Sequence, residues 1–211
     1  MEREDPSDAL VSNHYNSVSE LPENAVIGTC SLRRQCQLMN LRPDLRMVDL
    51  RGNVNTRLKK LDDGEFDAII LASAGLMRLG MADRISARFN SEDMLPACGQ
   101  GIVGIECKSD DAVTNKILKA LHDDDSLDRV TCERSLNARL GGSCSTPIAA
   151  FSELEGGKLR MRAMVGLPDG SRVLRASGTG PRTEARELGL RVAEDLLAQG
   201  ADEIIASFGA S

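Results

Sequence analysis

The sequence predicts an α/β protein in which a mostly parallel sheet is followed by a smaller α+β unit with an antiparallel sheet. Between residues 26 and 80, short apolar runs alternate with helical periodicity, which is typical of βαβ units and a sheet covered on both faces. Residues 158–166 instead alternate apolar and basic side chains, as a half-buried strand does. The chain has 211 residues, enough for one or two domains with buried cores.

The first part of the chain shows strands and helices in strict alternation. The helix after the first strand has its apolar stripe at Leu32, Cys36 and Met39, and Asp62-Asp63-Gly64 closes the next helix. In chain order, the expected elements are the strand 26–29, the helix 32–41, the strand 47–50, the helix 54–61 and the strand 68–72. We assign residues 1–94 to a central α/β domain.

The second part begins where Pro96, Gly99 and Gly101 interrupt the pattern, as expected at a crossing between units. The elements expected after it are the strand 102–107, the helices 110–121 and 126–140, the strand 158–166, a turn at 167–170, the strand 173–176 and the helix 183–198. We therefore expect a crossover with a returning strand and helix over residues 95–122. A C-terminal α+β domain would then occupy residues 123–211.

Composition excludes several classes of partner. The net charge is −6 and only five residues are aromatic, so the chain offers neither a basic surface nor stacking platforms for nucleic acid. The longest apolar run, residues 68–72, is far shorter than the ~20 residues of a membrane span. The N-terminal residues lack the apolar core of a secretory signal. We expect a cytoplasmic location, or the plastid stroma if a targeting segment is missing from this sequence.

The six cysteines include no C-x-x-C pair and the two histidines stand alone, so no metal site is expected. Most of the cysteines are expected to be small buried hydrophobes: Cys36 on its helical stripe, Cys107 at the end of an apolar strand, and Cys132 in a row with two leucines. Cys144 differs because it follows two glycines and a serine in a loop. An inert loop cysteine and a point of stable covalent attachment both fit this position, whereas a Cys-His hydrolase lacks its histidine.

Positive charge is concentrated in one stretch. Residues 25–60 hold eight Lys or Arg and two Asp or Glu, a local balance of +6 in an acidic chain. Arg33 and Arg34 lie in the first turn of a helix with Ser31 as its expected N-cap, where the helix dipole disfavours cations. This placement favours an anion bound at the helix start, although a solvated arginine pair is the alternative.

A second strand-Gly-Asn-helix turn carries Arg51 and Arg57. Because the carboxyl ends of parallel strands meet at one sheet edge, the four arginines are expected to converge on one crevice. A ligand with several acidic groups would fit there. Neither of the glycine-rich phosphate-binding motifs occurs in the chain, which disfavours a nucleotide site.

Taken together, these motifs resemble the porphobilinogen deaminase family, also called hydroxymethylbilane synthases. The resemblance is carried by a set of strings that occur in the same order along nearly the whole chain: 26–35, 50–54, 68–72, 95–101 and 133–144. It implies a periplasmic-binding-protein-like, two-lobed α/β architecture with an incomplete first lobe, followed by the small C-terminal domain.

The resemblance also implies an activity and a site. The family condenses four porphobilinogen molecules into hydroxymethylbilane, with release of ammonia, on a dipyrromethane cofactor that a thioether would attach to Cys144. Each pyrrole carries an acetate and a propionate, for which Arg33, Arg34, Arg51 and Arg57 would be the partners. The further cofactor or substrate contacts that the resemblance implies are Thr29, Ser31, Arg78 and Gln100.

The sequence departs from the family's pattern at the catalytic carboxylate. The family's general acid and base is an aspartate in the first domain, upstream of everything matched here, so most of that domain is expected to be absent. We expect a monomer that takes porphobilinogen as substrate and a separate N-terminal fragment as a partner. The alternative is a non-catalytic carboxylate-binding α/β module, because two-lobed binding proteins also hold carboxylates at sheet edges.

Overall fold

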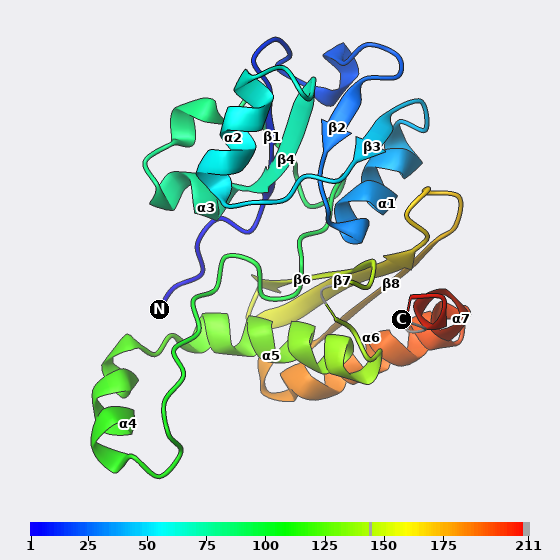
Figure 1. The fold of residues 1–211 in the computed structure, drawn as a ribbon. Coiled ribbons are helices and arrows are strands. Elements are labelled where there is room, and N and C mark those ends of the chain that lie inside the picture. The colour runs from blue at the N-terminus through cyan, green and yellow to red at the C-terminus, as the bar shows by residue number, and fades with distance from the viewer. Residues whose placement is uncertain (144, 209–211) are drawn as a thin grey trace.

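The computed structural model describes residues 1–143 and 145–208, which form two separate sheets with their helices (Figure 1). The central lobe contains a five-stranded sheet of order β3-β2-β4-β1-β5. β2 is parallel to β3 and β4, while β1 runs antiparallel to β4 and β5. The strands are β1 (Asp8–Val11), β2 (Val26–Gly28), β3 (Arg46–Val48), β4 (Ala68–Ala72) and β5 (Ala87–Arg88). The expected parallel arrangement is confirmed for β2 to β4, whereas β1 and β5 make the sheet mixed.

Helices cover both faces of this sheet, as the apolar strands predict. Successive residues of β4 point to opposite faces, so Ile70 joins the core beneath α1 while Ile69 joins the core beneath α2. The helices of the lobe are α1 (Leu32–Leu41), α2 (Val54–Asp62) and α3 (Ser73–Arg78), with short 3-10 turns η1 (Val18–Glu20) and η2 (Ala82–Arg84). Both longer helices begin where the sequence predicts.

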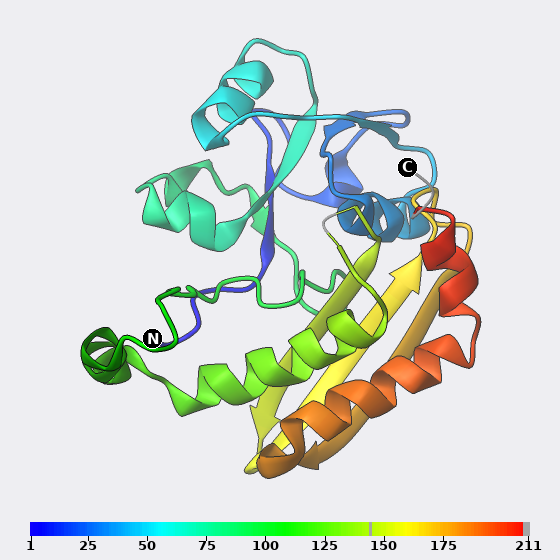
Figure 2. The ribbon, with the colours of Figure 1, turned by 60° about the horizontal axis from the view of Figure 1, so that its bottom comes forward.

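The C-terminal domain is an antiparallel sheet of order β6-β7-β8 with α5 and α6 on one face (Figure 2). Its core joins Leu136 of α5, Met161 of β7 and Leu188 of α6. Its elements are α5 (Asp124–Arg139), β6 (Ile148–Glu155), β7 (Lys158–Gly166), β8 (Val173–Pro181), the 3-10 turn η4 (Arg182–Glu184), α6 (Ala185–Leu197) and α7 (Ala201–Ala206). The predicted α+β class is confirmed, with β6 and α7 as additions.

The strand expected over residues 102–107 does not form. No strand pairs with this segment among the described residues, and Val103 and Ile105 are exposed. Alternating apolar residues form a strand only when a sheet edge receives their backbone groups. The helix α4 (Ala112–Leu118) and the turn η3 (Lys119–Leu121) follow, and α4 lies apart from both sheets in the two views (Figures 1 and 2).

α1 joins the central lobe to the C-terminal domain. Cys36 of α1 packs with Leu95 and with Met164 of β7 in a small buried cluster. The turn between β7 and β8 touches the end of the helix, where Asn40 Nδ2 donates to Gly170 O at 3.3 Å. The three-stranded sheet therefore supports the helix whose first turn carries Arg33 and Arg34. Within the described residues, no helix is long and apolar enough to cross a membrane.

Candidate functional site

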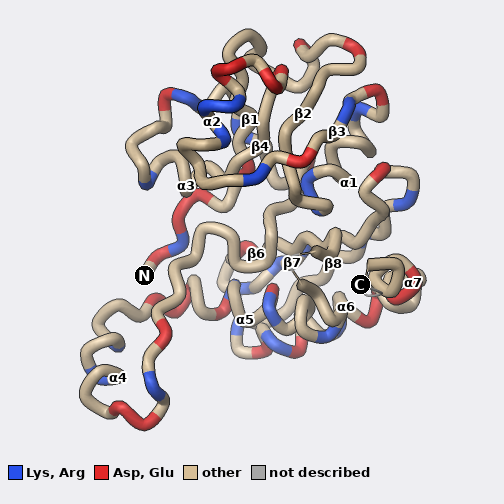
Figure 3. The backbone as a smooth tube through the Cα atoms, viewed as in Figure 1, with Lys and Arg blue, Asp and Glu red and all other residues tan. Residues whose placement is uncertain are grey.

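Apart from Gln100 and Cys144, the predicted site residues follow the carboxyl ends of three parallel strands. Since β2, β3 and β4 are parallel, the turn before α1 and the turn before α2 open on the same sheet edge. Figure 3 shows basic positions at the start of α1 and in the loop before α2, on the side of the lobe turned toward the three-stranded sheet. The shared edge inferred from the sequence is therefore confirmed.

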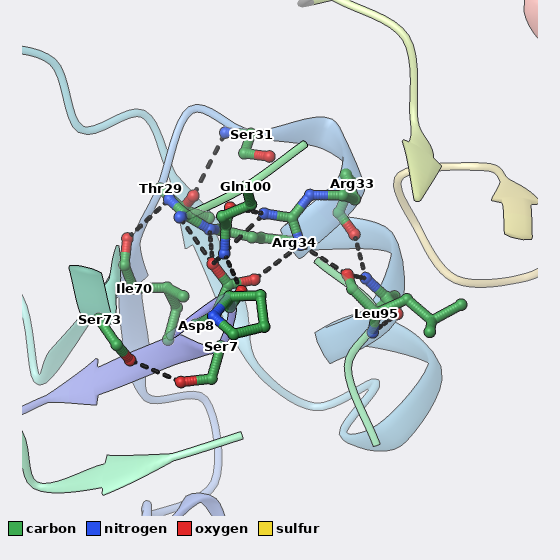
Figure 4. A network of polar contacts seen from close by, with 12 residues as sticks. Ser7, Asp8, Thr29, Ser31, Arg33, Arg34, Ile70, Ser73, Leu95 and Gln100 are labelled. Carbon is green, nitrogen blue, oxygen red and sulfur yellow. Dashed lines mark hydrogen bonds and ion pairs between the residues drawn. The ribbon is translucent and has the colours of Figure 1, made fainter. Parts of the chain in front are cut away.

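At this edge Arg33 and Arg34 bind a buried carboxylate of the protein itself, Asp8 (Figure 4). Arg33 Nη1 donates to Asp8 Oδ2 at 2.6 Å, and Arg34 Nη2 donates to Asp8 Oδ1 at 2.7 Å. Arg33 also donates to Leu95 O, and Arg34 to Ile70 O. Both guanidinium groups are nearly buried and tied to backbone on either side of the carboxylate.

Asp8 changes the interpretation of the arginine pair. The expectation that an anion lies at the start of α1 is correct, but the anion observed is Asp8 rather than a ligand. Burial by itself would raise the pKa of Asp8, yet the charges and hydrogen bonds of Arg33 and Arg34 hold it below its usual range. The ionised carboxylate neutralises one of the two arginines, and one positive charge remains.

Gln100 completes this cluster from the crossing segment. Its Nε2 donates to Asp8 Oδ1 at 3.0 Å and to Pro6 O at 2.6 Å, and its Oε1 accepts from Arg33 Nη2 at 3.4 Å. Gln100 thus contacts Arg33 and the carboxylate that Arg33 and Arg34 share.

Thr29 and Ser31 form the turn between β2 and α1. The buried Thr29 accepts a hydrogen bond from Ser31 N at its Oγ1, 3.2 Å away. Ser31 occupies the predicted N-cap position, but its side chain makes no capping hydrogen bond. The sequence therefore predicts the position correctly and the capping contact wrongly.

Arg51 and Arg57 do not join the buried pair. The Arg51 side chain is 81% exposed and meets Asp49 only at 3.4 Å. Arg57 Nε donates to Gly52 O at 2.7 Å, and the φ of +121° at Gly52 is one that glycine adopts readily. The four arginines thus divide into a buried, partly neutralised pair and two others, the exposed Arg51 in the loop before α2 and the half-buried Arg57 within α2.

Arg78 lines a cavity that is separate from the arginine cluster. It is exposed at the end of α3 and lines a cavity of about 530 Å³ together with Glu4, Gly101 and Val103. None of the residues that contact Asp8 lines this cavity. The structure therefore does not bring Arg78 into the arginine cluster.

A second buried ion pair was missed by the sequence analysis. Arg3 Nη1 donates to Glu133 Oε1 at 2.6 Å, and Glu133 also accepts from Gly99 N at 2.6 Å and Ser152 N at 2.8 Å. Arg3 Nε donates to Gln100 O at 2.9 Å, which links this pair to the first cluster. The apolar row of Cys132, Leu136 and Leu140 gave no signal for this pair, because Glu133 lies about 100° further around α5 than Cys132 and is buried by other contacts.

Of the five described cysteines, Cys36 and Cys132 are buried as the sequence analysis expects, whereas Cys30 is exposed and Cys98 and Cys107 are half-buried. Burial raises the pKa of the Cys36 and Cys132 thiols to about 11, which leaves them protonated and inert at neutral pH. Cys107 does not end a strand, because the strand is absent. Cys144 lies outside the described residues; before it, α5 ends at Arg139, and Gly141 follows with a φ of +67°. The described residues contain no group of three side chains that could hold a metal ion.

The fold and the strand-end residues define a mixed α/β protein with an attached α+β domain and an arginine cluster at its sheet edge. The chain belongs to the porphobilinogen deaminase family. Residues 1–116 match the family model described as porphobilinogen deaminase, dipyromethane cofactor binding domain, and residues 127–198 match the C-terminal domain of the same family. Members of the family are hydroxymethylbilane synthases, transferases of tetrapyrrole biosynthesis, and the matched domain takes its name from the dipyrromethane cofactor.

Among solved structures, one described as a methionine-binding lipoprotein from Bacillus subtilis is similar to part of the chain. The two share 13% sequence identity with a TM-score of 0.41, and the match covers 56% of this chain. The match spans 58% of the length of that structure.

Proposed function

We propose that this chain is the pyrrole-holding part of a hydroxymethylbilane synthase, which joins four porphobilinogen molecules into hydroxymethylbilane with release of ammonia. The observation that carries the proposal is the arginine cluster at the strand ends. Arg33 and Arg34 are held at the start of α1 with one unit of positive charge left after Asp8 is counted. Guanidinium groups match carboxylates two hydrogen bonds at a time, and each porphobilinogen carries two carboxylates.

The residues present fit a dipyrromethane, which would supply the nucleophilic pyrrole carbon for chain growth. Arg51 offers an exposed guanidinium whose ion pair to Asp49 is long, at 3.4 Å, and Arg57 stabilises the turn beside it. We assign carboxylate binding to Arg33, Arg34, Arg51 and Arg57, further contacts to Thr29, Ser31, Arg78 and Gln100, and thioether attachment to Cys144.

The attachment residue is tested by intact-mass measurement after incubation with porphobilinogen. We expect an adduct of dipyrromethane size on the chain, lost in Cys144→Ala and kept in Cys30→Ala. Cys30 is the matched control because it is an exposed thiol beside the arginine cluster. An unmodified Cys144 in a chain that nevertheless binds porphobilinogen would favour the non-catalytic carboxylate-binding module.

We further propose that residues 95–122 belong partly to a second α/β lobe, supplied by a separate polypeptide. Val113, Ile117 and Leu121 are spaced four residues apart, and the first two are 72% and 66% exposed. Val103 and Ile105 add exposed apolar side chains in a segment that pairs with no strand in the part of the chain that the structure describes. An extended segment and a helix with exposed apolar residues fit the open edge and face of a sheet.

The partner is tested by adding a first domain from another family member. We expect a 1:1 complex in gel filtration and the appearance of bilane formation, both lost when Val113→Ser and Ile117→Ser are combined. Leu79→Ser is the control, because Leu79 is an exposed leucine on the central lobe. A complex that survives the double substitution would place the partner elsewhere.

A further inference from the structure

We propose that Asp8 is a positioning residue of the ligand site: it locks the guanidinium groups of Arg33 and Arg34 into one arrangement and leaves the pair with a single excess positive charge for one ligand carboxylate. This inference rests on the proposed function, since it takes the ligand to be a pyrrole carboxylate. Asp8 lies at the start of β1, a strand outside every motif that the sequence analysis singled out.

The first argument is the completeness of the contacts around Asp8. Oδ2 accepts from Arg33 Nη1, while Oδ1 accepts from Arg34 Nη2 and Nε, from Gln100 Nε2 and, at 3.3 Å, from Arg33 Nη2. Every donor is a charged guanidinium or an amide that is itself held in place. A fully buried carboxylate with this many donors fixes the orientation of both arginine planes.

The second argument is charge. Two guanidinium groups buried side by side repel each other, and neither can lose its proton to relieve the repulsion. Asp8 removes most of that cost and leaves one positive charge, to which the N-terminus of the ten-residue helix α1 adds its partial positive charge. The remaining positive charge favours the binding of one further carboxylate, and the cost of burying a second cation without a counter-ion is avoided.

The third argument separates Asp8 from a role in proton transfer. The surrounding arginines hold the pKa of Asp8 below its usual range, although burial opposes them, so the carboxylate stays ionised at neutral pH. Its oxygens are already occupied by donors and it has no exposed surface. Asp8 therefore acts through Arg33 and Arg34 and does not itself exchange protons with a ligand.

The test is rescue of Asp8→Ala by formate, a carboxylate small enough for the space that the substitution opens. The full-length chain carries Cys144→Ala so that no covalent adduct forms, and formate is compared with chloride at equal ionic strength. Melting temperature is followed by circular dichroism and porphobilinogen binding by calorimetry. Asp44→Ala is the control, since Asp44 pairs with Arg42 in a partly exposed site.

We expect Asp8→Ala in chloride to melt lower and to bind porphobilinogen at least about tenfold more weakly than the parent, the effect of losing one charge-assisted contact. Formate should restore at least half of both losses in Asp8→Ala and change neither property in Asp44→Ala. Equal porphobilinogen affinity in the parent and Asp8→Ala, or no gain with formate, overturns the inference.

Two further outcomes are decisive. If Asp8→Ala does not fold, Asp8→Asn takes its place. Porphobilinogen binding to Asp8→Asn should weaken more steeply with added salt than binding to the parent, because the arginine pair then carries one more positive charge. An equal salt dependence overturns the inference. If the parent itself does not bind porphobilinogen, the proposed function fails, while melting with and without formate still decides whether Asp8 holds the arginine pair.

Discussion

Replacing Arg3 by methionine should destabilise the protein strongly, because it leaves a buried carboxylate without its counter-ion. The side chains of Arg3 and Glu133 are 2% and 0% exposed, and two hydrogen bonds of 2.6 and 3.2 Å join them. Methionine keeps much of the length and the apolar contact with Phe151, whose ring centre lies 5.0 Å from the guanidinium carbon. The substitution therefore removes mainly the charge and its hydrogen bonds.

The magnitude follows from this burial. Removing one partner of a buried ion pair costs about 3–5 kcal/mol, because the remaining charge keeps its desolvation penalty. For a chain of this size, each kcal/mol shifts the melting temperature by roughly 2–4 °C, so the expected fall is roughly 6–20 °C. The matched control is Arg84→Met, since Arg84 pairs with Asp62 at 2.7 Å near the surface. That control should cost less than about 1 kcal/mol.

The assay is urea unfolding followed by circular dichroism, because the chain has no tryptophan and one tyrosine to report by fluorescence. Combining Arg3→Met with Glu133→Gln should recover part of the loss, since the amide carries no buried charge and still accepts a backbone N–H. A loss in Arg3→Met no greater than in Arg84→Met refutes the reasoning. So does a double variant no more stable than Arg3→Met alone.

Three further predictions follow from the same structure. Gly170→Ala should lower the melting temperature more than Gly64→Ala. Both glycines have a positive φ, but only at Gly170 would the new Cβ lie 2.4 Å from the backbone of α1. Equal losses in the two variants would contradict the docking of the β7–β8 turn on α1. Burial raises the pKa of Glu133 above its usual range against the opposing effect of Arg3. As the pH falls, Glu133 therefore takes up its proton at a higher pH in the folded state than in the unfolded state. Stability from this group should therefore be lost as pH rises through the raised pKa, and Glu133→Gln should flatten that part of the stability-pH curve measured by urea titration; an unchanged curve contradicts it. Leu136→Ala should cost about 2–5 kcal/mol in urea unfolding, against a small effect for the exposed Leu121→Ala.

Local patterns in the sequence predicted much of the fold. The 3.6-residue apolar stripe of α1 and the two-residue alternation of β7 each specify which face is buried, and both elements form where expected. Short strands were harder to predict from the sequence. β1 has only four residues, and its identity depends on pairing with β4, some 60 residues away along the chain. The segment 102–107 shows the converse, because it has a strand's composition but pairs with neither sheet of residues 1–143 and 145–208.

The candidate site was predicted in the same uneven way. The excess of arginine in residues 25–60 and the two strand-to-helix turns located the sheet edge correctly. The helix-dipole argument correctly required an anion near Arg33 and Arg34. It could not identify that anion as Asp8, which lies 25 residues earlier in the chain. The separation of Arg51 from the buried pair was also invisible, because exposure depends on how the turn packs.

The sequence by itself determined the alternation of strands and helices, the parallel strand ends and the family, because these are encoded in local apolar periodicity and short motifs. Only the tertiary structure decided which charges neutralise one another. Arg3 and Glu133 are 130 residues apart, and their pairing exists only where the crossing segment meets α5. Buried ion pairs form wherever folding brings opposite charges together out of water, so their partners depend on three-dimensional packing.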